Sequence, residues 1–230
     1  MADEPLLPHQ ITLLGEAMRP LWRKIETQLG HHVLPATAAY GMAEIVSSHL
    51  DELQPLAHRL TDRINSLMSD VVANESATDG DVYHAVDRFE AFVDDLLAGY
   101  REVRALNAYG RDAAARDLLA GVYRHTLVEI RDWLEDLVKT LADPMAVVRL
   151  RGLPTTGYVE LPLTLTLTAA PELAALSRWI EGNAGTFSSG GTIRRKSGLG
   201  FWGTVGAVIL GWGIGDALFG NDDCGHDGGA

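Results

Sequence analysis

Apolar residues recur at alternating intervals of four and three positions in the middle of the chain, and this spacing restricts the fold more than any other feature. Between residues 82 and 103 it is unbroken, at Val82, Val86, Phe89, Val93, Leu96, Tyr100 and Val103. Such spacing places one apolar stripe along an α-helix, as in bundles and coiled coils. Asp79 and Asp81 stand where their carboxylates can cap the first free amides. The sequence therefore predicts a long helix that packs along one side.

A second stretch, after a break at Tyr109-Gly110, has the same character. Its apolar face comprises Leu119, Val122, Thr126, Trp133, Leu137 and Leu141. Asp143-Pro144 is expected to end this helix, because the residue before a proline is displaced from helical geometry. Since the break is short, we expect the two helices, each of about 30 residues, to form an antiparallel hairpin.

Two further helices are expected upstream of this pair. Residues 35–73 carry apolar residues at helical intervals, and Pro55 is expected to kink or split that helix. A less regular helix is expected from His9 to Leu29, with an interruption at Pro20. Four long helices joined by short turns predict a mainly α-helical fold, with an elongated antiparallel four-helix bundle over residues 1–143.

The character of the chain changes at Pro144. Residues 146–151 and 158–168 are predicted strands, the second because leucine and threonine alternate in it, and a turn-rich link joins them. They would form a small β-hairpin, followed by a short helix at 171–181, so that residues 144–181 make a second region. Residues 182–196 are expected to be a flexible linker with a basic end.

The C-terminal region 197–220 carries an uncharged run of 19 residues, from Ser197 to Gly215. As a helix this run would cover roughly 28 Å, close to the hydrocarbon thickness of a bilayer. Arg194, Arg195 and Lys196 precede it, and an acidic, glycine-rich tail of residues 221–230 follows it. By the positive-inside rule, we expect a membrane-associated protein with its bundle in the cytoplasm and its C-terminus across the membrane.

Small residues recur at every fourth position of this apolar segment, at Gly203, Ala207, Gly211 and Gly215. They would form a smooth stripe on which a second helix can pack closely, so we expect a homo-oligomer. Six glycines in residues 199–219, and Asp216 near the end of the span, lower the apolar content of the segment. A buried hairpin, or a segment packed in a soluble assembly, stays open as the alternative.

The residues indicate no catalytic, metal or cofactor site. No nucleophile motif or phosphate-binding loop occurs, and the single cysteine, Cys224, lies in the tail. The pairs His58 with Asp62 and Asp81 with His84 lack the carboxylate–histidine pattern of a bundle metal site, and we interpret them as ordinary polar residues. The net charge of −12 argues against nucleic-acid binding, which needs clustered lysine and arginine.

We therefore expect a non-enzymatic protein that self-associates and is linked to membrane lipid, with pore formation as one form of this activity. A helical bundle, a hairpin and a glycine-rich apolar segment are parts that α-helical pore-forming proteins use, a similarity of architecture alone. Two alternatives remain. One is a constitutively tail-anchored cytoplasmic adaptor, and the other is a soluble structural subunit whose glycine-rich tail packs between copies.

Overall fold

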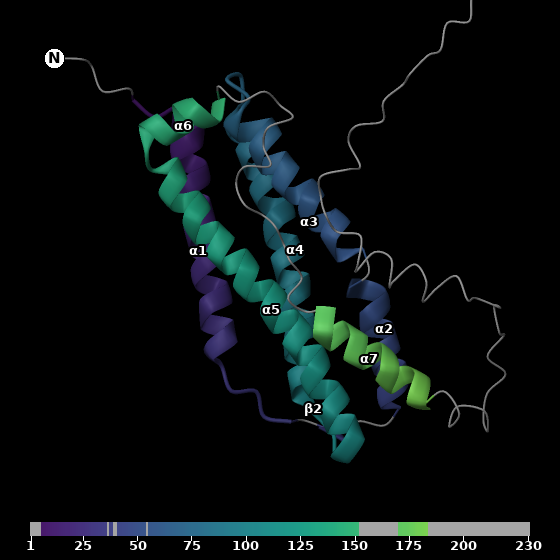
Figure 1. The fold of residues 1–230 in the computed structure, drawn as a ribbon. Coiled ribbons are helices and arrows are strands. Elements are labelled where there is room, and N and C mark those ends of the chain that lie inside the picture. The colour runs from purple at the N-terminus through teal and green to yellow at the C-terminus, as the bar shows by residue number, and fades with distance from the viewer. Residues whose placement is uncertain (1–5, 36, 39–40, 54, 152–169, 184–230) are drawn as a thin grey trace, which may run out of the picture. The chain divides into compact units, whose positions relative to one another are not determined.

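The structure is a computed structural model, which describes residues 6–35, 37–38, 41–53, 55–151 and 170–183. These residues are mainly helical, as the sequence predicts (Figure 1). Contacts divide the chain into two units, Met1–Thr192 and Ile193–Ala230. Every described residue belongs to the first unit, and the account below is of that unit.

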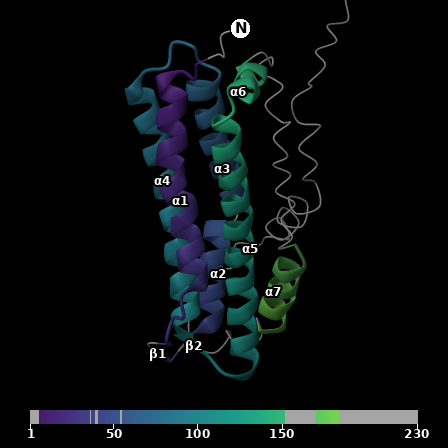
Figure 2. The ribbon, with the colours of Figure 1, turned by 90° about the vertical axis from the view of Figure 1, so that its left-hand side faces the viewer.

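Three long helices form the main core: α1 (His9–Gly30), α4 (Asp79–Ala105) and α5 (Gly110–Leu141). Each of them packs against the other two. In Figure 1, α4 and α5 run in opposite directions, and Figure 2 shows α1 lying along both. Every apolar position predicted between residues 82 and 103, and on the second stretch from 119 to 141, is buried. The apolar spacing therefore identified the packing faces of α4 and α5 correctly.

Aromatic stacking joins α4 to α5 in the middle of this core. The rings of Phe89 and Trp133 stack with centroids 5.6 Å apart, and Phe92 lies 6.3 Å from Phe89. The third helix, α1, contributes a stripe at the same alternating intervals, formed by the buried Ile11, Leu14, Met18, Leu21 and Ile25. Complete burial of one such side chain is worth about 1.5–3 kcal/mol, so these stripes supply most of the stabilisation.

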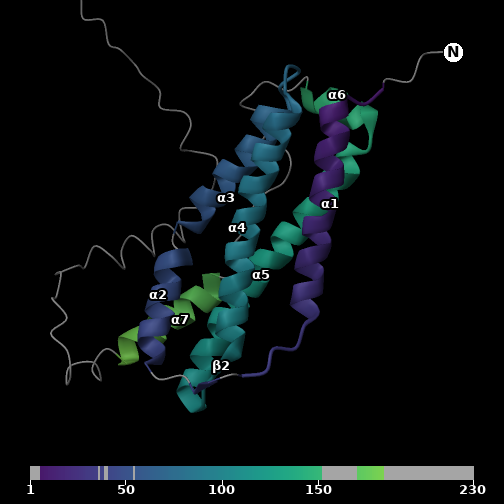
Figure 3. The same cartoon turned by 180° about the vertical axis from the view of Figure 1, so that it is seen from behind.

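A fourth run of helices lies beside α4, as Figure 3 shows. It consists of α2 (Met42–Leu53), α3 (Leu56–Asn65) and the π-helical segment η1 (Ser66–Val72). The predicted split at Pro55 is confirmed, because α2 ends before this proline and α3 begins after it. Two-residue strands, β1 (Thr37–Ala38) and β2 (Leu106–Asn107), pair in parallel beside the α4–α5 turn.

The predicted interruption at Pro20 is wrong, because α1 is continuous from His9 to Gly30. Proline removes one backbone donor and its ring crowds the carbonyl four residues earlier, which disfavours a helix interior. Pro20 lies on the exposed side of α1, between the buried Met18 and Leu21. Burial of the apolar stripe on the other side therefore keeps the helix intact despite the lost hydrogen bond.

The predicted strand at residues 146–151 is also wrong, because these residues form α6 (Pro144–Arg151). Valines favoured a strand there. The Asp143 carboxylate instead accepts a hydrogen bond from the Met145 backbone amide at 2.9 Å, and Pro144 suits a first helical position. Burial of Val147 then fixes the helix on the core. The second predicted strand, residues 158–168, lies outside the described residues.

The first turn of α4 is closed by a capping box, in which Thr78 and Asp81 exchange hydrogen bonds. The predicted carboxylate cap is thus confirmed for Asp81, with Thr78 as its partner, but not for Asp79, whose carboxylate accepts a hydrogen bond from the Gln10 side chain at 3.4 Å. Hydrogen bonds from the Thr78 side chain and backbone hold the pKa of the Asp81 carboxyl below its ordinary value of 3.8. Because the folded-state pKa is lowered, this contribution to stability is present above pH 3.8 and is lost as the pH falls through the folded-state pKa.

We predict that Pro20→Ala raises the free energy of unfolding by about 1–3 kcal/mol, because alanine restores the missing backbone donor and suits the helix interior. Urea denaturation followed by circular dichroism measures this change. Arg19→Ala, at the neighbouring exposed position, is the matched control and should change the free energy by less than about 0.5 kcal/mol. An unchanged or lower stability of Pro20→Ala would contradict the prediction.

Candidate functional site

The functional residues predicted from the sequence lie outside the described residues. This applies to the small-residue stripe of Gly203, Ala207, Gly211 and Gly215 and to the basic flank of Arg194, Arg195 and Lys196. Within the described ranges, no helix is both long enough and apolar enough to cross a membrane. The residues that the structure does bring together are polar groups between α2, α3, α4, α5 and α7 (Ala170–Asn183).

The histidine–carboxylate pairs considered above are found at separate places. His58 and His84 are exposed, and Asp81 belongs to the capping box. No group of three histidine, cysteine, aspartate or glutamate side chains suited to a metal ion occurs in the part of the chain that the structure covers. These residues give no support to a bundle metal site.

A buried polar pair joins α2 to α5. The Nδ1 atom of His49 and the hydroxyl of Tyr123 share a hydrogen bond of 2.9 Å, and the two rings meet edge to face with centroids 5.7 Å apart. His49 is 5% exposed and Tyr123 is 2% exposed. Because polar groups buried without a partner are costly, this bond fixes the position of α2 on α5.

Gly99 of α4 makes room for the Tyr123 ring. A Cβ atom at position 99 would lie 2.7 Å from the Tyr123 hydroxyl oxygen, far inside van der Waals contact. Burial raises the pKa of the Tyr123 phenol, the carboxylates of Glu52 and Glu102 raise it further, and Arg59 opposes them. The phenol therefore stays protonated and has a proton to share with His49.

Arg59 of α3 lies at the break between α2 and α3 and links both to α4. Its guanidinium donates to the backbone carbonyl of Glu52 at 3.5 Å and lies 4.0 Å from the Asp95 carboxylate. The same group stacks over the Phe92 ring, 5.6 Å from the centroid. Arg59 thus supports the end of α2 near the His49–Tyr123 pair.

The π-helical segment η1 is fastened to α4 by a second polar cluster. Arg88 donates to the Ser66 hydroxyl at 2.8 Å, and this hydroxyl donates to the Asp70 carboxylate, also at 2.8 Å. Arg151 at the end of α6 donates to the Val72 carbonyl, where η1 ends. Short π-helical stretches often mark functional sites. Here each of these side chains already has a partner within the fold.

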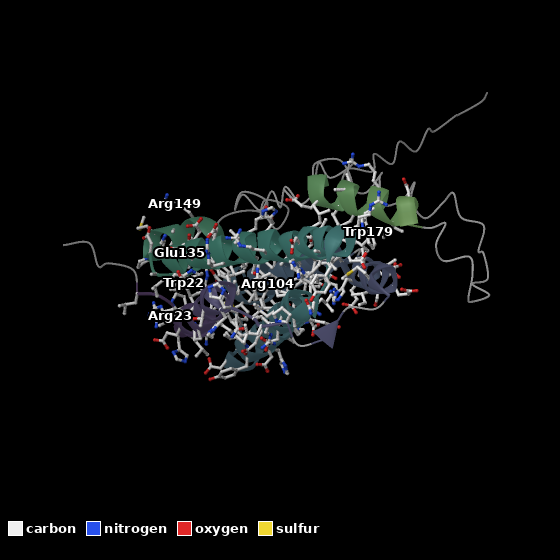
Figure 4. All side chains as sticks on the ribbon, turned by 90° about the horizontal axis from the view of Figure 1, so that it is seen from below. Trp22, Arg23, Arg104, Glu135, Arg149 and Trp179 are labelled. Atoms are coloured by element: carbon white, nitrogen blue, oxygen red, sulfur yellow. The ribbon has the colours of Figure 1, made fainter. Side chains whose placement is uncertain are left out.

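Helix α7 covers one side of α5 and also contacts α2. Leu176 is its one fully buried side chain among residues 172–182, and Leu173, Trp179 and Ile180 are partly buried against the core. Figure 4 shows Trp179 between α7 and the helices that it covers. On α5, the Nδ1 atom of His125 lies 3.6 Å from Glu172, an ion pair when the imidazole is protonated. Beside it, Gly121 faces the side chain of Glu172.

The sequence held a weak signal for the His49–Tyr123 pair, which sequence reasoning missed. His49 falls on the same stripe of α2 as the buried Met42 and Val46, where a polar residue needs a partner. Gly99 lies next to Tyr100, at a buried position of α4 where a larger side chain would be expected. Neither position alone identifies Tyr123 as the partner, because that depends on how α2 packs on α5.

Comparisons of the chain with protein-family models, with curated proteins and with solved structures found no match.

We predict that Gly99→Ala lowers the free energy of unfolding by about 1–3 kcal/mol, because the new methyl group must displace the buried Tyr123 ring. Gly121→Ala is the matched control, since a Cβ there lies at an ordinary 3.7 Å from Glu172. It should stabilise the protein by about 0.5–1 kcal/mol through helix propensity. Urea denaturation of both variants measures the difference, and equal effects would contradict the close approach of α4 to Tyr123.

We predict that the Tyr123 phenol contributes no phenolate signal near pH 10. The chain has six tyrosines, and the raised pKa of Tyr123 keeps its phenol protonated. Ultraviolet absorbance should therefore show the same phenolate signal from wild type and Tyr123→Phe up to about pH 11, while both remain folded. A smaller signal from the variant near pH 10 would mean that Tyr123 titrates normally and is not buried as described.

Proposed function

We propose that this protein is a non-enzymatic, self-associating helical-bundle protein linked to membrane lipid through its C-terminal apolar segment, with pore formation as one form of its activity. The observation that carries this proposal is the 19-residue uncharged run with basic residues before it and acidic residues after it. Length and flanking charge together are typical of a membrane helix whose basic side stays in the cytoplasm. In this proposal the bundle is cytoplasmic and the C-terminus crosses the membrane.

The arrangement of the soluble part fits such a role. We propose that α1, the α2–α3–η1 run, α4 and α5 act as the four helices of an elongated antiparallel bundle, followed by α6, α7 and the C-terminal helix. The short connection between α4 and α5, and their opposite directions in Figure 1, support this proposal. The bundle would carry the apolar segment and bring copies of it together.

Self-association is proposed from the composition of the segment. A helix with glycine or alanine at positions 203, 207, 211 and 215 has little side-chain surface of its own along that stripe. Close packing against copies of the same helix would supply van der Waals contacts that lipid alone provides poorly. The carboxylate of Asp216 is also easier to accommodate between helices or near the interface than in lipid.

Two other functions have specific support. The basic flank of Arg194, Arg195 and Lys196 equally suits a constitutively tail-anchored adaptor, which would be membrane-bound without permeabilising the bilayer. The six glycines in residues 199–219 suit a soluble structural subunit, whose tail packs between copies in a large particle. Fractionation separates these cases, because only the last gives the full-length protein as a large discrete particle in the soluble fraction without detergent.

We predict that full-length protein permeabilises vesicles made of equal parts phosphatidylcholine and phosphatidylglycerol, and that a chain ending at Thr192 does not bind them. Replacement of Gly203, Ala207, Gly211 and Gly215 by leucine should reduce dye leakage at least about tenfold, because the helices can no longer approach closely. The apolar content rises in this variant, so membrane binding itself should persist. Dye release and vesicle flotation measure the two effects.

The matched control replaces the three glycines that lie off the stripe, Gly200, Gly206 and Gly213, by leucine, and this variant should still cause leakage. Leakage that survives the changes on the stripe would contradict the proposed packing. Carbonate-resistant membrane association without any leakage would favour the adaptor, and a large soluble particle would favour the structural subunit.

A further inference from the structure

The interface between α7 and the helices it packs on, α5 and α2, buries fewer side chains than the core does. Helices α4 and α5 have buried side chains along their whole lengths, whereas among residues 172–182 of α7 only Leu176 is fully buried. Ala174, Arg178 and Glu181 are exposed on its outer side. A helix of 14 residues is marginal in water without packing, so this shallow contact decides whether α7 stays in place.

The surface of α5 beneath α7 includes a glycine and a polar side chain. Gly121 and His125, one helical turn apart, face Glu172 of α7, and the His125 and Glu172 side chains keep 37% and 24% of their surface exposed. The residues that α5 buries in the core, such as Leu119, Leu127 and Ile130, occupy other positions around the helix. Removal of α7 would therefore leave the α1–α4–α5 core closed.

Release of α7 would lengthen the stretch of chain that connects the core to the uncharged run. When α7 is docked, residues 184–196, 13 in number, connect the bundle to the uncharged run. When it is released, the connection extends from the end of α6 over residues 152–196, 45 in number. Fully extended, the 13 residues span about 45 Å, whereas the 45 residues, with α7 kept helical, span about 125 Å. Release would therefore nearly triple the reach of the apolar segment.

We propose that α7 is a releasable strap, which detaches from α5 and α2 as one helix while the core stays folded, and whose release lengthens the chain that connects the core to the apolar segment. Release is local and needs no membrane. Control of the apolar segment by the strap rests on the membrane-linked function proposed above. These two parts can be tested separately.

A disulfide across the interface tests the strap in the full-length chain. A Cβ atom at position 121 lies 3.7 Å from the Cγ atom of Glu172, the position that a cysteine sulfur would take. Gly121→Cys with Glu172→Cys, in a Cys224→Ser background, should therefore form an intramolecular disulfide on oxidation, because the two positions face each other across the interface. The reduced form of the same protein is its own control. Gly121→Cys with Cys224→Ser alone controls for oxidation.

Hydrogen exchange measured by mass spectrometry tests whether α7 is released, and it needs no membrane. In the reduced protein, α7 amides should exchange at least about 100-fold faster than amides of α5 between Leu119 and Leu137, because local opening costs less than global unfolding. Oxidation should slow α7 exchange at least about tenfold and leave α5 unchanged. Equal protection of α7 and α5 in the reduced protein would overturn the strap, because α7 would then belong to the cooperative core.

Dye leakage from the same vesicles tests whether α7 controls the activity of the apolar segment. The oxidised protein should lose most of its leakage and regain it when a reductant is added, whereas the single-cysteine control should leak under both conditions. Equal leakage from both forms would overturn control by the strap. If wild type also causes no leakage, the proposed function fails and control of the segment fails with it. Fast exchange of α7 would then still support release.

Discussion

Packing of α5 against α1 and α4 is the constraint on which the other described elements depend. Leu119, Leu127 and Leu134 of α5 are fully buried, and the stacked rings of Phe89 and Trp133 join α4 to α5 between them. Helices α2, α6 and α7 each pack on α5. Burial of apolar surface is non-directional, so it brings these helices together but does not by itself fix their register. The polar contacts at the edges of the core supply that register.

The His49–Tyr123 pair illustrates this division of roles. The hydrogen bond adds little net stability, because both groups lose contact with water on folding. A shifted α2, however, would leave two buried polar atoms without partners, which is far more costly. Gly99 makes the arrangement possible by leaving space for the ring, and Arg59 supports the end of α2 beside it. The pair therefore selects one packing of α2 among several of similar apolar burial.

Features of the fold that depend on residues close together in the sequence could be predicted from it. Features that depend on contacts between distant residues could not. The stripe from Val82 to Val103 is a local pattern, and it located the buried face of α4. Pro55 and Pro20 have the same intrinsic effect, yet only Pro55 ends a helix, because the buried stripe on either side of Pro20 keeps α1 continuous. At residues 146–151 the cap from Asp143 and the burial of Val147 outweigh the strand preference of valine. The contact of His49 with Tyr123 spans 74 positions, and no local pattern encodes it.

The number of buried side chains falls from the α1–α4–α5 core to α7, and this difference connects the fold to the proposed function. The stripes of α1, α4 and α5 each bury five or more side chains, whereas α7 buries Leu176 and half-covers its other apolar residues. Regions that move are drawn from the least stable part of a structure, because a small opening free energy permits release without loss of the core. The described helix nearest in sequence to the apolar segment, α7, is thus one that buries few side chains. In the function proposed above, release of one short helix would free the C-terminal region, while the α1–α4–α5 core stays folded.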